Sequence, residues 1–177
     1  MDRFAVALLL VLGCAVPASA GELPARKAGL WEMKTTTSSG RALQMQQCVD
    51  AQTDGATQAK ANSDSEARGC SKRDVKKAGD TFTVDSTCTQ AGKTRTNHTV
   101  ITGSFDSGYT MVITAQSEEA PAGRTITVEA KWLGPCAADQ KPGDTIMPDG
   151  KKMNVLEMQK RMGQPAAPAV PGAAPAH

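Results

Sequence analysis

Cysteine is the residue type in this chain whose chemistry is easiest to predict, because four of the five cysteines follow a segment that resembles an export signal. Residues 1–20 have a basic start, an apolar run and the small residues Ala18 and Ala20 before a cleavage site, as a signal peptide does. An exported chain meets an oxidising compartment, in which thiols pair. We therefore expect a periplasmic protein with disulfide bonds among the four remaining cysteines, Cys48, Cys70, Cys88 and Cys136.

Four cysteines allow three pairings. Cys48 and Cys70 flank a polar segment that a bond between them would close off, whereas Cys88 ends one predicted strand and Cys136 follows another. We predict the pairs Cys48–Cys70 and Cys88–Cys136, each contributing on the order of 3–4 kcal/mol by restricting the unfolded chain. The alternative is a zinc or redox site, although the sequence has no Cys-x-x-Cys motif and His98 is the one suitable imidazole.

The fifth cysteine, Cys14, lies within the predicted signal peptide. Val11-Leu12-Gly13-Cys14 loosely resembles the box at which bacterial lipoproteins are cleaved and acylated. Leu12 is bulkier than the small residue usual there, and the cysteine comes early in the chain. Cleavage before Gly21 is therefore preferred, with the lipoprotein kept as the alternative.

Nucleophilic catalysis needs an imidazole beside a serine or cysteine, and His98 and His177 are the two histidines. His98 lies in a polar run that predicts a solvated strand position, and His177 is the last residue. The paired carboxylates Glu118 and Glu119 could serve glycoside hydrolysis, but they are more simply the charged end of a strand. We therefore expect no catalytic site and no cofactor.

Methionines gather near the C-terminal end of the chain. Met158 and Met162 are four residues apart, on one face of a predicted helix. Thioether sulfur is a soft donor that suits Cu(I), which makes these two residues copper candidates. The preferred interpretation is a flexible apolar helix face that packs on a sheet, without a metal.

Alternation of apolar and polar residues predicts the strands that position these side chains. Gly29–Thr35 and Ala42–Cys48 form a hairpin, and a longer connection covers Glu119–Gly123. Four further strands are joined by a tight turn at Ala91–Lys93, a longer connection at Ser104–Gly108 and the one at Glu119–Gly123: Phe82–Cys88, Thr94–Thr102, Tyr109–Ala115 and Thr125–Trp132. The predicted fold class is mainly β, an antiparallel meander sheet, curled or barrel-like, with a short C-terminal helix and disulfide staples.

Three stretches lie outside the meander. Residues 49–69 contain one large aliphatic residue, so we expect an exposed loop with one or two helical turns near Gln52–Ala61. Lys152–Met162 has the apolar spacing of a short amphipathic helix. Residues 163–177 are rich in Pro and Ala, which predicts a disordered tail and a single β-rich domain over 27–162.

The overall composition excludes some classes of partner. A net charge of +2 argues against nucleic acid, which requires a basic face. After residue 20, no run approaches the roughly 18 apolar residues of a membrane-spanning helix. Because aromatic residues make up 3% of the chain, we expect the core to depend on Val, Ile, Leu, Met and Ala.

The ordered cysteines and an opening Gly-Leu-Trp-Glu motif resemble a family of exported bacterial proteins, domain of unknown function 3617. The matching segments are Gly29–Glu32, Gln47–Val49, Cys70, Cys88 and Trp132–Cys136, within a resemblance that covers Lys27–Met162. The resemblance implies a Gram-negative envelope location and a small β-rich domain, and it supplies no activity or catalytic residue. The polar segment 49–69 and the tail are expected to be peripheral to the shared domain.

We therefore expect a non-enzymatic periplasmic domain that binds or interacts in the cell envelope. Its partner would be an envelope protein or an apolar small molecule. A lipid carrier with a lipocalin-like curved sheet is the alternative, because a curved meander beside a helix could hold an apolar guest. The low aromatic content leaves few large side chains to line such a pocket.

Overall fold

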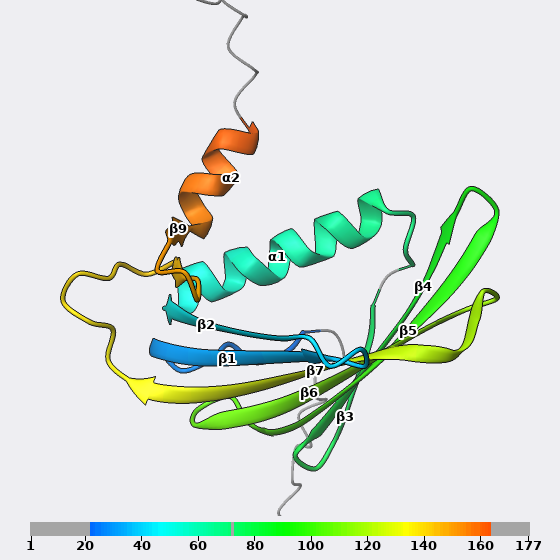
Figure 1. The fold of residues 1–177 in the computed structure, drawn as a ribbon, viewed down its shortest axis with the longest axis horizontal. Coiled ribbons are helices and arrows are strands. Elements are labelled where there is room, and N and C mark those ends of the chain that lie inside the picture. Colours follow the sequence, from blue (N-terminus) through cyan, green and yellow to red (C-terminus); the bar gives the residue numbers. More distant parts are fainter. Residues whose placement is uncertain (1–21, 72, 164–177) are drawn as a thin grey trace, which may run out of the picture.

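The computed structural model describes residues 22–71 and 73–163, which contain one antiparallel sheet and two helices (Figure 1). The strands are β1 (Gly29–Thr37), β2 (Ala42–Val49), β3 (Asp74–Ala78), β4 (Thr81–Gln90), β5 (Lys93–Ser104), β6 (Gly108–Ser117), β7 (Ala120–Gly134), β8 (Asp144–Ile146) and β9 (Lys152–Asn154). The helices are α1 (Ala51–Ala67) and α2 (Val155–Gly163). The strands lie in the order β3-β4-β5-β6-β7-β1-β2-β8-β9.

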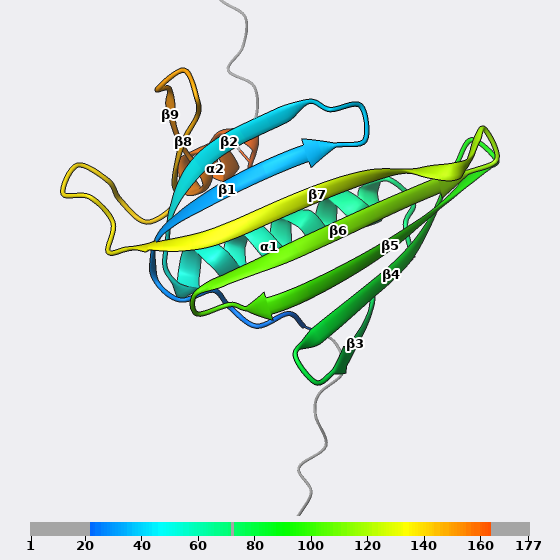
Figure 2. The ribbon, with the colours of Figure 1, turned by 60° about the horizontal axis from the view of Figure 1, so that its bottom comes forward.

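The sheet is curled, with β3 and β9 as its free edges, and it does not close into a barrel. Figures 1 and 2 show α1 crossing its concave side, from the end of β2 toward the far end of β4. The predicted fold class, a curled antiparallel sheet with disulfides and a short C-terminal helix, is confirmed. β1 lies between β7 and β2, so the chain's first strand joins the meander to the hairpin.

The sheet has an inner face toward α1 and an outer face toward solvent. Strand register places Tyr109 opposite Ala130, and Ile101 opposite Met111, all on the inner face. Glu129 and Lys131 alternate with Ala130 and are exposed on the outer face. The strand register therefore separates an apolar inner face from a solvated outer face.

The core is more aromatic than the composition suggested, and the expectation of an aliphatic core is wrong. Trp31 is fully buried, with its ring centroid 5.9 Å from that of Tyr109. Phe105 lies 4.9 Å from Tyr109 and 5.6 Å from Phe82, measured between ring centroids. The described aromatic residues are few, but the register gathers them at one end of the inner face, where they pack with Trp132 and the buried aliphatics.

Helix α1 replaces the loop that was expected over 49–69, and it is longer than the one or two turns predicted. A capping box starts it: the Asp50 side chain accepts from the Thr53 backbone N–H at 2.8 Å, and the Asp50 N–H donates to Thr53 Oγ1 at 2.9 Å. Ala, Gln and Lys then favour the helix by intrinsic propensity. Because alanine is the only apolar side chain in α1, the periodic signal that reveals most helices is missing.

Other boundaries also differ from the predictions. β7 begins at Ala120, so the connection expected at Glu119–Gly123 is a tight turn followed by strand. The short strands β3, β8 and β9 were not predicted, and the last occupies the first turn of the predicted C-terminal helix. The predicted signal peptide, with Cys14, and residues 164–177 of the predicted tail lie outside the described residues.

Candidate binding site beneath helix α1

The four cysteines form two disulfides, but the predicted pairing is wrong. The bonds are Cys48–Cys136, with 5.5 Å between Cα atoms, and Cys70–Cys88. The position of β1 explains the first bond: Leu30 of β1 lies opposite Cys48 on one side and opposite Gly134 on the other. The chain that leaves β7 therefore passes the end of β1 and reaches Cys48.

The two disulfides fasten the two ends of α1 to different strands. Cys48, in β2, comes just before the helix, and Cys70 comes just after it and forms an isolated bridge with Cys88 of β4. In the sheet, β5, β6, β7 and β1 lie between these two attachment points. The observed pairing holds α1 across the inner face at both of its ends. The predicted Cys48–Cys70 bond would instead have joined the two ends of the helical segment to each other.

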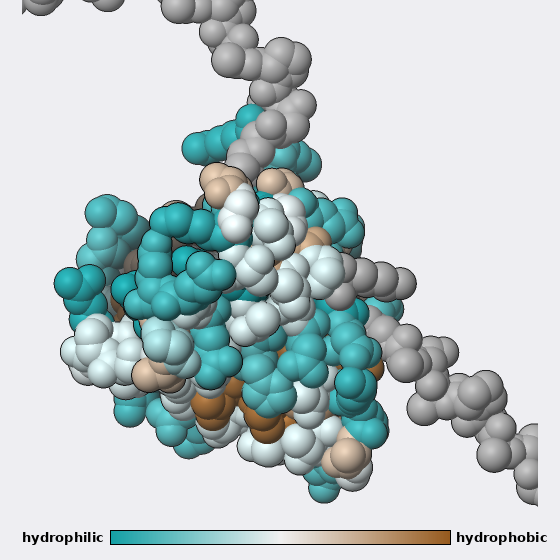
Figure 3. All heavy atoms as spheres, turned by 90° about the vertical axis from the view of Figure 1, so that its right-hand side faces the viewer, coloured by the Kyte–Doolittle hydropathy of each residue, from teal (hydrophilic) through white to brown (hydrophobic). Residues whose placement is uncertain are grey.

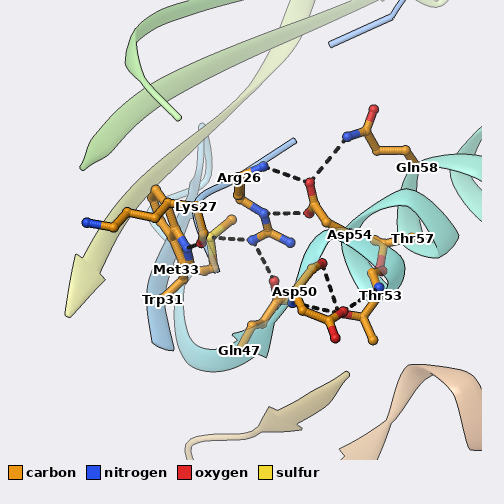
Figure 4. Close-up of polar contacts among 10 residues, drawn as sticks. All are labelled: Arg26, Lys27, Trp31, Met33, Gln47, Asp50, Thr53, Asp54, Thr57 and Gln58. Atoms are coloured by element: carbon orange, nitrogen blue, oxygen red, sulfur yellow. Dashed lines mark hydrogen bonds and ion pairs between the residues drawn. The ribbon is translucent and has the colours of Figure 1, made fainter. Parts of the chain in front are cut away.

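A buried ion pair fixes the N-terminal half of α1 on the sheet (Figure 4). Arg26 is 9% exposed and Asp54 of α1 is 3% exposed. The Arg26 Nε donates to Asp54 Oδ1 at 2.8 Å, and the Arg26 backbone N–H donates to Oδ2 at 2.9 Å. Gln58, one turn further along α1, donates to the same Oδ2 at 3.3 Å.

The Arg26 guanidinium connects this pair to the sheet. Its Nη1 donates to Gln47 Oε1 at 2.9 Å and lies 3.8 Å from the Met33 sulfur, while its Cζ lies 6.0 Å from the centroid of the Trp31 ring. Burial raises the pKa of the neighbouring Tyr109, and the charge of Arg26 opposes that shift. Arg26, which precedes β1, therefore links helix α1 to the sheet.

Beyond the Arg26–Asp54 pair, α1 covers the inner face of the sheet only partly. We call Met111 and Ile113 of β6, with Ile126 and Val128 of β7, the apolar strip; the register pairs Met111 with Val128, and Ile113 with Ile126. Ile126 is 36% exposed and the other three are half-buried, whereas Ile101 on the adjacent strand is 1% exposed. The apolar strip faces a helix that has no large apolar side chain to cover it.

A cavity of about 450 Å³ lies where the C-terminal end of α1 meets the far ends of β4, β5 and β6. We call it the end cavity. Figure 3 views the molecule from this side and shows a mainly hydrophilic surface with small apolar areas. The cavity is lined by Ser65, Arg68, Cys70, Cys88, Gln90, Lys93, Thr94, Arg95, Asn97, Ser117, Glu118 and Glu119.

The end cavity continues the apolar strip along the same face of the sheet. Asn97 of the cavity lies opposite Ala115, and the next inner pair along β5 and β6 is Thr99 with Ile113 of the apolar strip. A second hollow, of about 620 Å³, lies between α1 and the segment 22–25, and Leu23 is the only large apolar residue in its lining. Of these two hollows, the end cavity is the one that joins polar groups to the exposed apolar strip.

Besides Cys70 and Cys88, which line the end cavity, the candidate catalytic and metal-binding residues lie elsewhere, with one exception. His98 is exposed on the outer face, where its Nδ1 lies 2.6 Å from Asp85 Oδ1. Met158 is 43% exposed on α2, and the side chain of Met162 lies outside what the structure describes. The exception is the pair Glu118 and Glu119, which form the turn between β6 and β7 and line the end cavity.

Sequence reasoning missed the residues that build this site. Arg26 and Asp54 are distant in sequence and follow no motif, and Arg68 and Arg95 look like ordinary surface cations until α1 is placed. One usable signal was present in the sequence. The spacing Asp50-x-x-Thr53 is typical of a helix start and would have predicted a helix in place of the loop.

Neither helix within the described ranges has the length and apolar character that crossing a bilayer requires. No curated protein and no solved structure matches this chain. A family model described as a protein of unknown function, DUF3617, matches residues 26–136, a shorter span than the resemblance suggested. The match begins at the buried Arg26 and ends at Cys136, so it contains α1 and leaves out β8, β9 and α2. Since it covers more than half of the sequence and all four disulfide cysteines, the chain belongs to the DUF3617 family.

Proposed function

We propose that this protein is a non-enzymatic binding domain of the periplasm that holds an apolar guest between α1 and the inner face of the sheet. Two disulfides support an oxidising compartment, and the signal-like residues 1–20 support export into one. A binding role agrees with the position of His98, which is on the outer face and away from both hollows beside α1.

The observation that carries this proposal is the mismatch between α1 and the surface that it crosses. The helix is fastened near both of its ends, by the Arg26–Asp54 pair and by the Cys70–Cys88 bond, and contributes only alanines as apolar side chains. The apolar strip therefore stays partly exposed to water, and this exposure is unfavourable in free energy for the isolated protein. A guest that covered it would gain roughly 1 kcal/mol for each half-exposed side chain.

A neutral fluorescent probe, N-phenyl-1-naphthylamine, tests the proposal. We expect the mature protein to bind it, and Ile126→Gln to weaken binding several-fold, because a polar side chain would then interrupt the apolar strip. Leu133→Gln is the matched control, since Leu133 is 43% exposed but lies outside the apolar strip. Failure of the wild-type protein to bind, or equal loss in both variants, would contradict the proposal.

The natural guest can be sought directly. Native mass spectrometry of protein isolated from its own periplasm should show an added mass that disappears on denaturation. Extraction in organic solvent should recover an apolar compound. Consistently ligand-free spectra, together with no binding of the probe, would exclude the carrier role.

A further inference from the structure

We propose that the end cavity binds the anionic head, a carboxylate or a phosphate, of a single-chain amphiphile whose apolar chain lies on the apolar strip. This inference rests on the proposed function and adds the chemical class of the head group. It follows from three features: two arginines on opposite walls of the cavity, a local excess of positive charge, and the continuity of the cavity with the apolar strip.

Arg95 and Arg68 enter the cavity from different elements. Arg95 lies on β5 opposite Cys88 on one side and Ser117 on the other, and both neighbours line the cavity. The Asn97 amide lies on this same face, since it contacts Cys88 Sγ at 3.4 Å. Arg68 is the C-terminal cap of α1, so its side chain comes from the helix. A ligand between helix and sheet would therefore meet a guanidinium on each side.

The charges of the cavity favour an anion. Its lining holds three cationic residues and two acidic ones. Lys93 and Glu119 form an ion pair with each other, which leaves Arg68 and Arg95 against Glu118 at the hairpin turn. Across the described ranges, neither arginine takes part in an ion pair. Guanidinium groups bind carboxylate and phosphate through paired, charge-assisted hydrogen bonds, so an oxyanion is the ligand they suit best.

The position of the apolar strip sets the rest of the ligand. From Arg95 to Thr99, the partner of Ile113, there are four residues of β5, or about 13 Å along the strand. A ligand with its head at Arg95 would therefore reach Ile113 and Ile126 through a single extended chain. The polar side chains of Thr94, Ser117 and Ser65 at the cavity end would exclude a purely apolar ligand from that region.

Three ligands that share one chain length separate the head from the tail: dodecanoate and dodecyl phosphate, each below its micelle concentration, and dodecanol below its solubility limit. In competition with N-phenyl-1-naphthylamine, we expect the two anions to bind about tenfold more tightly than dodecanol. Arg95→Gln and Arg68→Gln should each remove most of that advantage without changing the affinity for dodecanol. Arg41→Gln, which changes an exposed arginine in the β1–β2 turn, is the control and should change nothing.

The order of dodecanoate and dodecyl phosphate then distinguishes a fatty acid from a phosphate-bearing lipid as the source of the head. Equal affinity for all three ligands, unaffected by either arginine variant, would overturn the head-group assignment and leave the proposed function standing. Absence of binding by all three, with no binding of the fluorescent probe, would overturn both.

Discussion

At the scale of single residues, Arg26 and Asp54 are unusual because they bring two charges into the interior between helix and sheet. Removing charged groups from water costs several kcal/mol each, and their attraction offsets that cost only when the remaining donors and acceptors are also satisfied. Here Gln47 and Gln58 complete the arrangement. The pair is consequently a means of orienting α1 on the sheet, and its disruption should be expensive.

Asp54→Ala should lower the free energy of unfolding by about 3–5 kcal/mol, because Arg26 would be left buried and unpaired. Urea-induced unfolding measures the change. Glu129→Ala is the control: its partner Lys34 is 3.5 Å away and both side chains are more than half exposed, so the loss should be about 1 kcal/mol or less. Similar losses in the two variants would show that the buried pair does not fix the helix.

Asp50 should make the start of α1 sensitive to acid. The hydrogen bond from the Thr53 backbone N–H lowers the pKa of Asp50 below its ordinary 3.8. A carboxyl with a depressed pKa in the folded state stabilises the fold above its unfolded pKa, and this contribution is lost as the pH falls through the folded value. Asp50→Asn keeps the cap, so its stability at pH 7 should change by less than about 1 kcal/mol.

Below about pH 4, the wild-type protein should lose stability that the Asp50→Asn variant keeps, so the gap between their urea midpoints should narrow or reverse. Midpoints measured from pH 6 to pH 2 test this expectation. Two curves that remain parallel over the whole range would show that Asp50 does not contribute to the acid sensitivity.

At the scale of elements, predictability depended on whether burial leaves a repeating pattern. In sequence, β4, β6 and β7 alternate because one face of each is buried, β5 alternates less cleanly, and short turns fix their register. α1 is held by a cap, an ion pair and flanking disulfides, which leave no periodic trace. The strands β8 and β9 are too short to show alternation. The sequence could therefore show that Ile113 and Ile126 are apolar inner-face residues, but not that α1 crosses over them.

The two disulfides should differ in what they stabilise. By the chain-entropy estimate, Cys48–Cys136, with a separation of 88 residues, contributes about 4.6 kcal/mol, and Cys70–Cys88, with a separation of 18, contributes about 3 kcal/mol. Replacing each pair by serine and measuring urea unfolding should reproduce that order. The reverse order would show that local strain or residual structure in the unfolded chain dominates.

Hydrogen exchange should separate the roles of the bonds further. Without Cys70–Cys88, the second half of α1 loses its covalent attachment, so amides of residues 60–67 should exchange faster while β6 and β7 stay protected. Without Cys48–Cys136, increased exchange should be centred on β2 and the start of α1. A uniform rise in exchange across the sheet in both variants would contradict separate anchoring.

At the scale of the whole molecule, the open sheet has two free edges, which in principle invite pairing with another chain. β9 is three residues long, and β3 is five residues long and carries an exposed Asp74–Lys76 ion pair. Short strands and charge are common protections against edge-to-edge association. Short strands and charge thus protect the free edges of this open sheet, whereas a closed barrel of the lipocalin type would have no free edges.

Removing the charges at the β3 edge should promote association. We expect the double variant Asp74→Thr/Lys76→Thr to form larger species as concentration rises, measured by size-exclusion chromatography with light scattering. Lys34→Thr/Glu129→Thr deletes the same number of charges from the two central strands β1 and β7 and should remain unchanged. If both variants elute alike, β3 is not the vulnerable edge.

The attachment of α1 at both ends determines how a molecule could enter. A lid with one hinge can move away from a site, but α1 is attached at both ends and cannot. The space between α1 and the sheet is therefore open only along the two sides of the helix. A guest would therefore enter from one flank of the helix, and branched or double-tailed compounds would be disfavoured by their bulk and not by their charge. Exchange would then slow as the tail lengthens, because a longer tail covers more of the apolar strip, and reduction of the Cys70–Cys88 bond would accelerate it.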